Sequence, residues 1–219
     1  FFFFFSIIHL LEFYICTPNF WNTLNNITPN KSLLSATSKF DLMLPVILLG
    51  LTFLSFYLFS DFLHFNESRT DGYIISDWVI ENTTSINFNF EILLLTYIPI
   101  TVGLSSALSE KNSIMITCLS IVTLLGFRTI SLYTFPLQPP ADIIPLRDEF
   151  LFHTFYNQDN MVKDLFFSGH TAAVCLLAFI VKVRWLKMAL FCCTILLAAA
   201  LVLQHVHYLI DVLVAPVFS

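Results

Sequence analysis

Charged side chains are scarce in this chain. Only 11% of its 219 residues are charged, whereas 57% are hydrophobic and 25 are phenylalanine. Soluble globular domains carry charged side chains at roughly a quarter of their positions. The composition therefore excludes an ordinary soluble domain and indicates that the lipid bilayer is the solvent. The net charge of −5 also argues against a nucleic acid as partner.

Cysteine is present, but not at the regular spacings of a disulfide framework or a metal site. Most of the five cysteines lie inside apolar runs, and their positions are Cys16, Cys118, Cys175, Cys192 and Cys193. This pattern fits neither a disulfide scaffold nor a metal site. We interpret these side chains as small hydrophobic groups.

A positively charged leader is missing as well. Residues 1–16 lack the basic region of a signal peptide, and they are short for a span of about 20 residues. We interpret residues 1–40 as an N-terminal segment that is either an interfacial helix or an imperfect chain start. Residues 41–219 are expected to form the membrane domain.

Six apolar runs predict transmembrane helices, at residues 41–60, 91–109, 113–135, 167–183, 187–205 and 206–219. Each of the first five has roughly the length that a hydrocarbon core of about 30 Å requires. The sixth is shorter and is expected to be cut off before it crosses. The predicted fold is an all-α polytopic membrane helix bundle of about six transmembrane helices, the last of them truncated.

Basic residues in the loops predict the orientation of the bundle. They gather before the first span, between the second and third, and between the fourth and fifth, at Lys31, Lys39, Lys111, Lys182, Arg184 and Lys187. Lysine and arginine favour the cytoplasmic side of a membrane. The loops at 61–90 and 136–166 are then expected on the non-cytoplasmic side, which is periplasmic, lumenal or exoplasmic.

A polar tripeptide opens the fourth predicted span, in the sequence LFFSGHTAAV (165–174). Ser168 is a preferred helix N-cap, and Gly169 lets backbone amides approach a ligand closely. The amino end of a helix binds phosphate well because its N–H groups are unpaired and carry partial positive charge. By itself, the tripeptide is explained at least as well by a capped helix with an incidental His170.

The last predicted span holds His207 and Asp211, four residues apart, which predicts that both project from one face of one helix. An ionisable pair inside a membrane segment is a functional candidate, since burying it without a use is costly. The carboxylate would fix the imidazole tautomer and leave the other ring nitrogen nucleophilic or basic. A satisfied structural pair is the alternative. His205 faces elsewhere on such a helix, so no three side chains converge on a metal and neither metal nor cofactor is expected.

The two histidine motifs together resemble those of the type 2 phosphatidic acid phosphatase superfamily, and more closely its sphingomyelin synthase-like branch. The branch's Asp-x-x-x-Ser-Gly-His-Thr corresponds to residues 164–171, and its His-x-His-Tyr-x-x-Asp-Val to residues 205–212. The likeness extends over about residues 41–219 in the number and order of spans. It implies catalytic roles for His170, His207 and Asp211, and substrate-binding roles for Ser168, Gly169, Asp164 and Tyr208.

Two departures from the superfamily bear on the substrate. No Lys-x6-Arg-Pro motif is present, and Leu201 stands where the superfamily has an arginine six residues before its second histidine. A doubly charged phosphomonoester needs more cations than a singly charged diester, so the loss favours a diester. Arg128, inside an apolar span, and Arg147, in the following loop, are the remaining candidates for phosphate contact. Each could instead pair with a loop acid.

These observations predict an integral membrane enzyme that transfers a phospholipid headgroup. His207 would form a phosphohistidine, and His170 would act as acid and then base. The expected partners are membrane lipids, namely a phospholipid donor and a ceramide or diacylglycerol-like acceptor, with no obligate protein partner. A lipid phosphate phosphatase, a transporter and an inactive scaffold are the alternatives. The lack of an internal repeat argues against the transporter.

Overall fold

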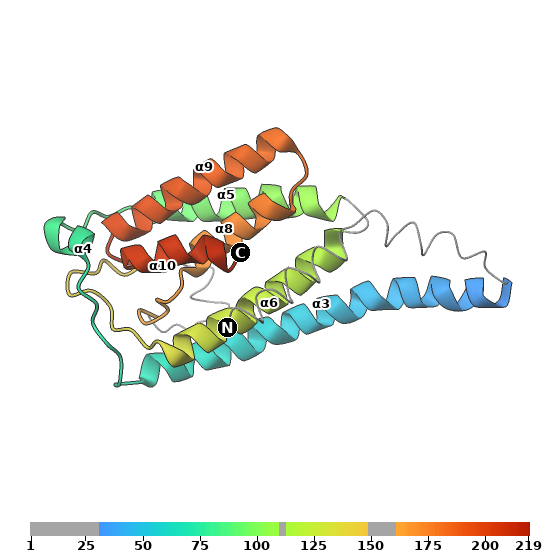
Figure 1. Ribbon diagram of the computed structural model, residues 1–219, viewed down its shortest axis with the longest axis horizontal. Coiled ribbons are helices and arrows are strands. Elements are labelled where there is room, and N and C mark those ends of the chain that lie inside the picture. Colours follow the sequence, from blue (N-terminus) through green and yellow to red (C-terminus); the bar gives the residue numbers. More distant parts are fainter. Residues whose placement is uncertain (1–30, 110–112, 149–160) are drawn as a thin grey trace. The chain divides into compact units, whose positions relative to one another are not determined.

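A computed structural model describes residues 31–109, 113–148 and 161–219, with only the backbone described for 31–42 (Figure 1). The chain divides into two units, Phe1–Leu44 and Pro45–Ser219. The described part of the first unit is the amino-terminal stretch of one helix. The second unit contains the rest of that helix and all the other described helices. The predicted segment 1–40 lies largely outside the described residues, and its boundary at residue 40 stays a prediction.

The regular structure of the described residues is helical, apart from one isolated bridge between Tyr73 and Leu137. The helices are α3 (Lys31–Ser68), α4 (Trp78–Asn82), α5 (Asn89–Leu108), α6 (Ser113–Thr134), α8 (Gly169–Ile180), α9 (Arg184–Leu203), α10 (Leu209–Val214) and the 3-10 helix η1 (Ala215–Val217). The predicted all-α polytopic membrane bundle is confirmed.

Four helices are long and apolar enough to cross a membrane: the Met43–Ser68 part of α3, α5, α6 and α9. They correspond to four of the predicted runs. The run at 167–183 is a shorter helix, because α8 has 12 residues and therefore spans about 18 Å. It begins only after its Ser168 cap and ends where Val181 turns extended. The last run, 206–219, divides into α10 and η1.

Helix α8 lies in the middle of the second unit. It packs against α5, α6, α9 and η1, and most of its side chains are buried. The main core cluster joins Val174 and Leu177 of α8 to Leu190 and Leu197 of α9 and to Ile92 of α5. Because α8 is enclosed by its neighbours, His170 in its first turn belongs to the interior of the bundle rather than to a lipid-facing surface.

The two ends of the bundle differ in the kind of connection they carry. Figure 1 shows the carboxyl end of α5, the amino end of α6 and the α8–α9 turn at one end. Helix α4 and the corner between α9 and α10 lie at the other end. The basic turn residues 182–187 are therefore remote from the α9–α10 corner. Which end faces the cytoplasm stays a prediction.

Gly103 allows α5 to pack closely on α8. A Cβ added there would lie 3.1 Å from Leu177 Cβ and 3.3 Å from its Cδ1, whereas a Cβ at Gly126 of α6 would meet nothing within 4 Å. Overpacking a core costs about 1–3 kcal/mol. We expect Gly103→Val to lower the apparent Tm of the detergent-solubilised protein by roughly 2–10 °C. Gly126→Val is the matched control and should melt like the wild type. Equal melting of the two variants would contradict this packing.

Candidate active site

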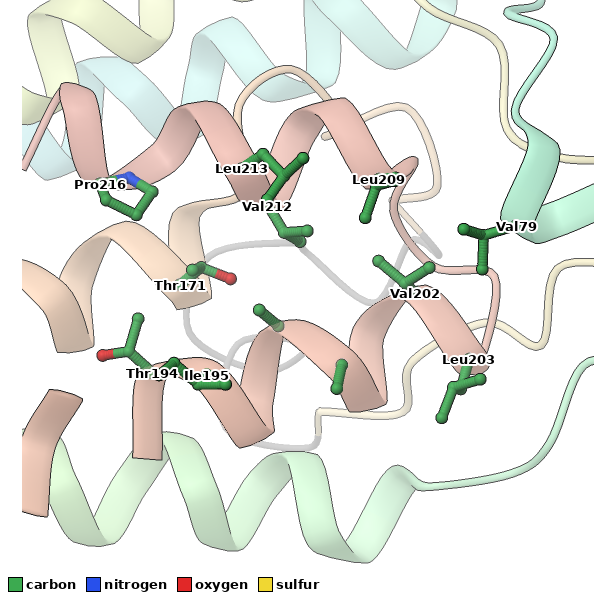
Figure 2. A pocket seen from close by; sticks show the side chains of 12 residues that line it. Val79, Thr171, Thr194, Ile195, Val202, Leu203, Leu209, Val212, Leu213 and Pro216 are labelled. Carbon is green, nitrogen blue, oxygen red and sulfur yellow. The ribbon is translucent and has the colours of Figure 1, made fainter. Parts of the chain in front are cut away.

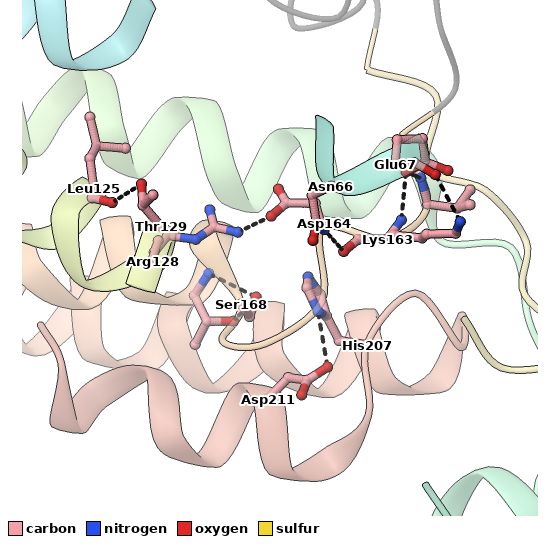
Figure 3. A network of polar contacts seen from close by, with 12 residues as sticks. Asn66, Glu67, Leu125, Arg128, Thr129, Lys163, Asp164, Ser168, His207 and Asp211 are labelled. Atoms are coloured by element: carbon pink, nitrogen blue, oxygen red, sulfur yellow. Dashed lines mark hydrogen bonds and ion pairs between the residues drawn. The ribbon is translucent and has the colours of Figure 1, made fainter. Parts of the chain in front are cut away.

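A buried polar cluster lies at the amino end of α8, where three parts of the chain meet (Figure 3). Arg128 comes from α6, Asp164 and Ser168 come from the segment that leads into α8, and His207 and Asp211 come from the α9–α10 corner and α10. All of them except Asp164 are buried. Ionisable side chains inside a membrane bundle are costly and are functional candidates by default. The structure thus gathers most of the residues that the sequence singled out.

The predicted His207–Asp211 pair is present, but its predicted helical geometry is wrong. Helix α10 starts at Leu209, so His207 precedes it and Tyr208 is the N-cap. Asp211 folds back across the helix end: its Oδ2 accepts the Tyr208 backbone N–H at 3.1 Å and lies 3.4 Å from His207 Nδ1. A proton on Nδ1 directed at this carboxylate leaves Nε2 with its lone pair. The dyad therefore depends on helix capping rather than on a shared helical face.

An unusual backbone conformation sets the corner that carries His207. His205 has a φ of 60°, in the left-handed region that usually favours glycine after a helix end. The N–H groups of Val206 and His207 both point to the Leu201 carbonyl, at 3.0 and 3.4 Å, which closes the end of α9. The His205 ring itself lies 3.1 Å from Thr83 Oγ1. His205 was expected to face elsewhere on a helix shared with His207, but both residues precede α10, and the contact with Thr83 is what directs its ring.

Ser168 and Gly169 attach α8 to the rest of the cluster. The Ser168 side chain accepts the Thr171 N–H as the N-cap of α8, and its own backbone N–H donates to the Asp211 carbonyl at 3.1 Å. A Cβ added at Gly169 would overlap the guanidinium of Arg128. Glycine is needed here because a cation lies directly against the backbone at the amino end of α8.

Arg128 is paired with an acid and also faces the helix end. Its guanidinium donates to Asp164 in an ion pair, and it lies over the Phe59 ring at 5.2 Å. The structural alternative for Arg128, pairing with a loop acid, is therefore present, while its contact with a substrate phosphate stays a prediction. Pairing with Asp164 cancels most of the positive charge that the arginine brings.

The segment before Asp164 is fixed to the carboxyl end of α3. Glu67 Oε2 accepts the backbone N–H groups of Val162 and Lys163, at 3.1 and 2.9 Å. Lys163 Nζ donates to the Glu67 carbonyl at 2.8 Å, and Asn66 Nδ2 donates to the Lys163 carbonyl at 2.9 Å. This reciprocal bracket holds Asp164 where it meets the α6 arginine (Figure 3).

Two predicted substrate-binding residues have other partners. The Tyr208 hydroxyl donates to the Gln138 carbonyl at 2.9 Å and is buried. Arg147 is exposed, and its backbone N–H points to Asn89 Oδ1 at 3.4 Å. None of the contacts described for Arg147 joins it to the cluster. The structure therefore does not bring it together with the other candidates.

Two residues that the sequence did not single out lie near the cluster. Asp148 is buried, and both of its carboxylate oxygens accept the Tyr97 hydroxyl, at 2.8 and 2.7 Å. Asp148 lies within electrostatic reach of His170, as do Arg128, Asp164 and His207. A tyrosine inside a membrane-spanning helix was a signal that could have drawn attention to this pair.

Unpaired polar atoms concentrate in the cluster. In the described ranges, six buried side-chain nitrogen or oxygen atoms have no hydrogen-bond partner: Asn66 Oδ1, Thr96 Oγ1, Arg128 Nε, His170 Nε2, His205 Nδ1 and Asp211 Oδ1. More than nine in ten buried polar groups are normally paired. Three of these atoms belong to Arg128, His170 and Asp211. Oxygen atoms of a substrate and its reacting proton would pair with such groups.

A separate groove of about 480 Å³ lies on the other face of α10 (Figure 2). Leu209, Val212 and Leu213 of α10 face Val202 of α9 across it, with Thr171 between them. No titratable side chain is among the residues that line it. Acid–base chemistry therefore belongs to the polar cluster and not to this groove.

Residues 163–219 match the family model described as PAP2 superfamily C-terminal. The matched part contains the Ser168-Gly169-His170 turn as well as His207 and Asp211. The match supports the superfamily part of the resemblance, and with it a membrane enzyme of the phosphatase or phosphotransferase kind. No curated protein matches the chain significantly.

Close approach of Arg128 to the α8 backbone makes Gly169 a sensitive position. Gly169→Ala should displace the guanidinium and lower turnover of a phosphoester substrate at least about tenfold, which is roughly 1.4 kcal/mol in the barrier. Gly126→Ala, in the same helix as Arg128 but in open space, should keep full activity. Turnover by purified, reconstituted protein is the measurement. Wild-type turnover in Gly169→Ala would show that the arginine is not needed at that place.

Proposed function

We propose that the cluster transfers a phosphate-linked headgroup from a phospholipid to the hydroxyl of a second lipid. The observation that carries the proposal is the combination of two histidines, one of them oriented by a carboxylate, with a single paired arginine. His207 is the nucleophile, Asp211 orients it, and His170 is the acid and base. The general class is supported by the family match at residues 163–219.

The first step forms a covalent intermediate. His207 Nε2 attacks phosphorus with its lone pair, while its Nδ1 proton stays directed at Asp211. The bond between phosphorus and the oxygen of the donor's lipid alcohol breaks. Protonated His170 gives its proton to that oxygen, so the alcohol leaves neutral. A phosphohistidine that carries the headgroup remains.

The second step reverses these roles. His170 takes the proton of the acceptor hydroxyl, and the acceptor oxygen attacks phosphorus as the bond to His207 Nε2 breaks. The first amides of α8, at Gly169 and His170, have no acceptor within the helix. They and Arg128 Nε are suited to the nonbridging oxygens on which charge develops. Water can replace the acceptor hydroxyl, which would give hydrolysis.

Charge favours a diester as the substrate. Arg128 is paired with Asp164, and the buried carboxylates of Asp148 and Asp211 add negative charge nearby. Leu201, where the superfamily has an arginine, is fully buried in the apolar core. One charge pair at about 4 Å is worth roughly 4 kcal/mol at an effective dielectric near 20. A monoester dianion would therefore be held much less well than a singly charged diester.

The proposed partners are membrane lipids, and the proposed site faces the non-cytoplasmic side of the membrane. A phospholipid is the donor, and a ceramide or diacylglycerol-like lipid is the acceptor. The basic turn at 182–187 lies at the end of the bundle opposite α4, which supports a site on the non-cytoplasmic side under the positive-inside rule. Hydrolysis of lipid phosphate monoesters is the second candidate function, and it would require more positive charge than the described residues supply.

The dyad is tested by two substitutions. His207→Ala should abolish turnover because no nucleophile remains, and Asp211→Asn should lower kcat by about two or more orders of magnitude, since the wrong tautomer is favoured. Both variants are compared with the wild type by headgroup transfer between radiolabelled lipids in vesicles. Expression and melting temperature serve as the control for folding, because Asp211 also caps α10. A folded Asp211→Asn protein with normal kcat would exclude the dyad.

The substrate class is tested by competition between ester types. Reconstituted protein should process phosphatidylcholine or phosphatidylethanolamine with a kcat/KM at least about a hundredfold higher than phosphatidic acid, a difference of roughly 2.7 kcal/mol. Released or transferred headgroup is measured for each lipid at the same surface concentration. A higher kcat/KM for phosphatidic acid would favour the phosphatase function instead.

A further inference from the structure

The connection between α3 and α5, which contains the short helix α4, exposes large apolar side chains. Tyr73, Ile74 and Trp78 are 70%, 77% and 75% exposed. Loops at a water-facing surface are normally polar. The acids of this stretch are turned away from solvent or paired: Asp77 is buried, and Glu81 accepts the Ser76 hydroxyl at 2.7 Å. Tyr73, Ile74 and Trp78 thus give the first half of the connection an apolar outer surface, whereas residues 81–84, in its second half, are polar and exposed.

The connection lies at the ends of helices of membrane-spanning length, where the interface of a bilayer is expected. It joins two helices of membrane-spanning length, and Tyr73 exchanges backbone hydrogen bonds with Pro136 and Gln138, just beyond the end of α6. Six residues of α6 separate Arg128 from that end, which is about 9 Å along the helix. Tryptophan and tyrosine are enriched where hydrocarbon meets headgroups.

The same connection contacts the α9–α10 corner at residues on either side of His207. Asp77 accepts the Val79 N–H with Oδ1, at 2.9 Å, and the Leu209 N–H with Oδ2, at 2.6 Å, so one carboxylate caps α4 and α10. On the other side of the corner, Thr83 Oγ1 lies 3.1 Å from His205 Nε2. Any shift of α4 would therefore be passed to the residues on either side of the histidine.

We propose that residues 73–86 are a membrane-interface anchor that binds the headgroup boundary of the bilayer through Tyr73, Ile74 and Trp78. Through the contacts of Asp77 and Thr83 with the α9–α10 corner, the anchor sets the depth of His207 below the interface. The binding of lipid follows from the exposed side chains alone, whereas its effect on turnover rests on the proposed function. The partner is the lipid surface itself rather than another protein.

Fluorescence tests the binding without reference to activity. The chain has three tryptophans, Trp21, Trp78 and Trp185. In the full chain with Trp21→Phe and Trp185→Phe, Trp78 reports alone. In phosphatidylcholine vesicles, lipids brominated near the headgroup should quench it strongly, and iodide present on both sides should quench it weakly. Strong iodide quenching with no effect of brominated lipid would overturn the anchor.

Kinetics test the link to the site. Trp78→Ser should raise KM for a long-chain phospholipid in vesicles about tenfold, which is roughly 1.4 kcal/mol of lost binding, and should leave kcat for a short-chain soluble diester unchanged. Trp78→Phe should restore KM. Trp185→Ser, at the amino end of α9 and 71% exposed, is the matched control and should behave as the wild type.

The outcomes separate the two proposals. Unchanged KM in Trp78→Ser, when the wild type turns over phospholipid, would overturn the link between anchor and site. Failure of the wild type to process any phosphodiester would count against the proposed function. In that case the quenching result alone would still support or overturn the anchor.

Discussion

Asp211 joins the two histidine motifs of this chain through its side chain and its backbone carbonyl. Its Oδ2 accepts the Tyr208 N–H and faces His207, and its backbone carbonyl accepts the Ser168 N–H. Capping α10, orienting an imidazole and attaching the start of α8 are therefore tasks of one buried residue. Since α8 and α10 meet there, the geometry of the cluster depends on this single point of attachment more than on any apolar contact.

The positive and negative charges of the side chains around Asp211 come close to cancelling one another. A lone arginine enters from α6 and is met by Asp164, which the bracket at the end of α3 holds in place. A further carboxylate, Asp148, is kept buried by the Tyr97 hydroxyl. The site therefore has little net positive potential. Its discrimination between substrates depends on how much negative charge each substrate carries.

Much of this arrangement could be predicted from the sequence, because apolar runs and residue types carry the information. The runs located the long helices, and Ser168, Gly169 and His170 were recognisable as a capped, phosphate-compatible helix start. The geometry of His207 was not predictable, because it depends on a positive φ at His205, where no glycine marks the turn. The pairing of Asp148 with Tyr97 was not predictable, because it is a contact between distant parts of the chain. The exposed position of Arg147 was not predictable either, since charge alone does not say where a loop side chain points.

The shortness of α8 has a consequence for the surrounding membrane. Helix α9 runs back along α8 with eight more residues, so the amino end of α8 lies about 12 Å short of the far end of α9. Under the proposed function, a lipid whose phosphate is to reach His170 would have to sink below the ordinary headgroup plane, or the bilayer would have to become thinner beside the protein. Adjusting to such mismatch costs fractions of a kcal/mol per Å. Membrane thickness would then act on catalysis as a physical variable in its own right, with thin, fluid bilayers delivering lipid to the recessed histidine more easily than thick, sterol-rich ones.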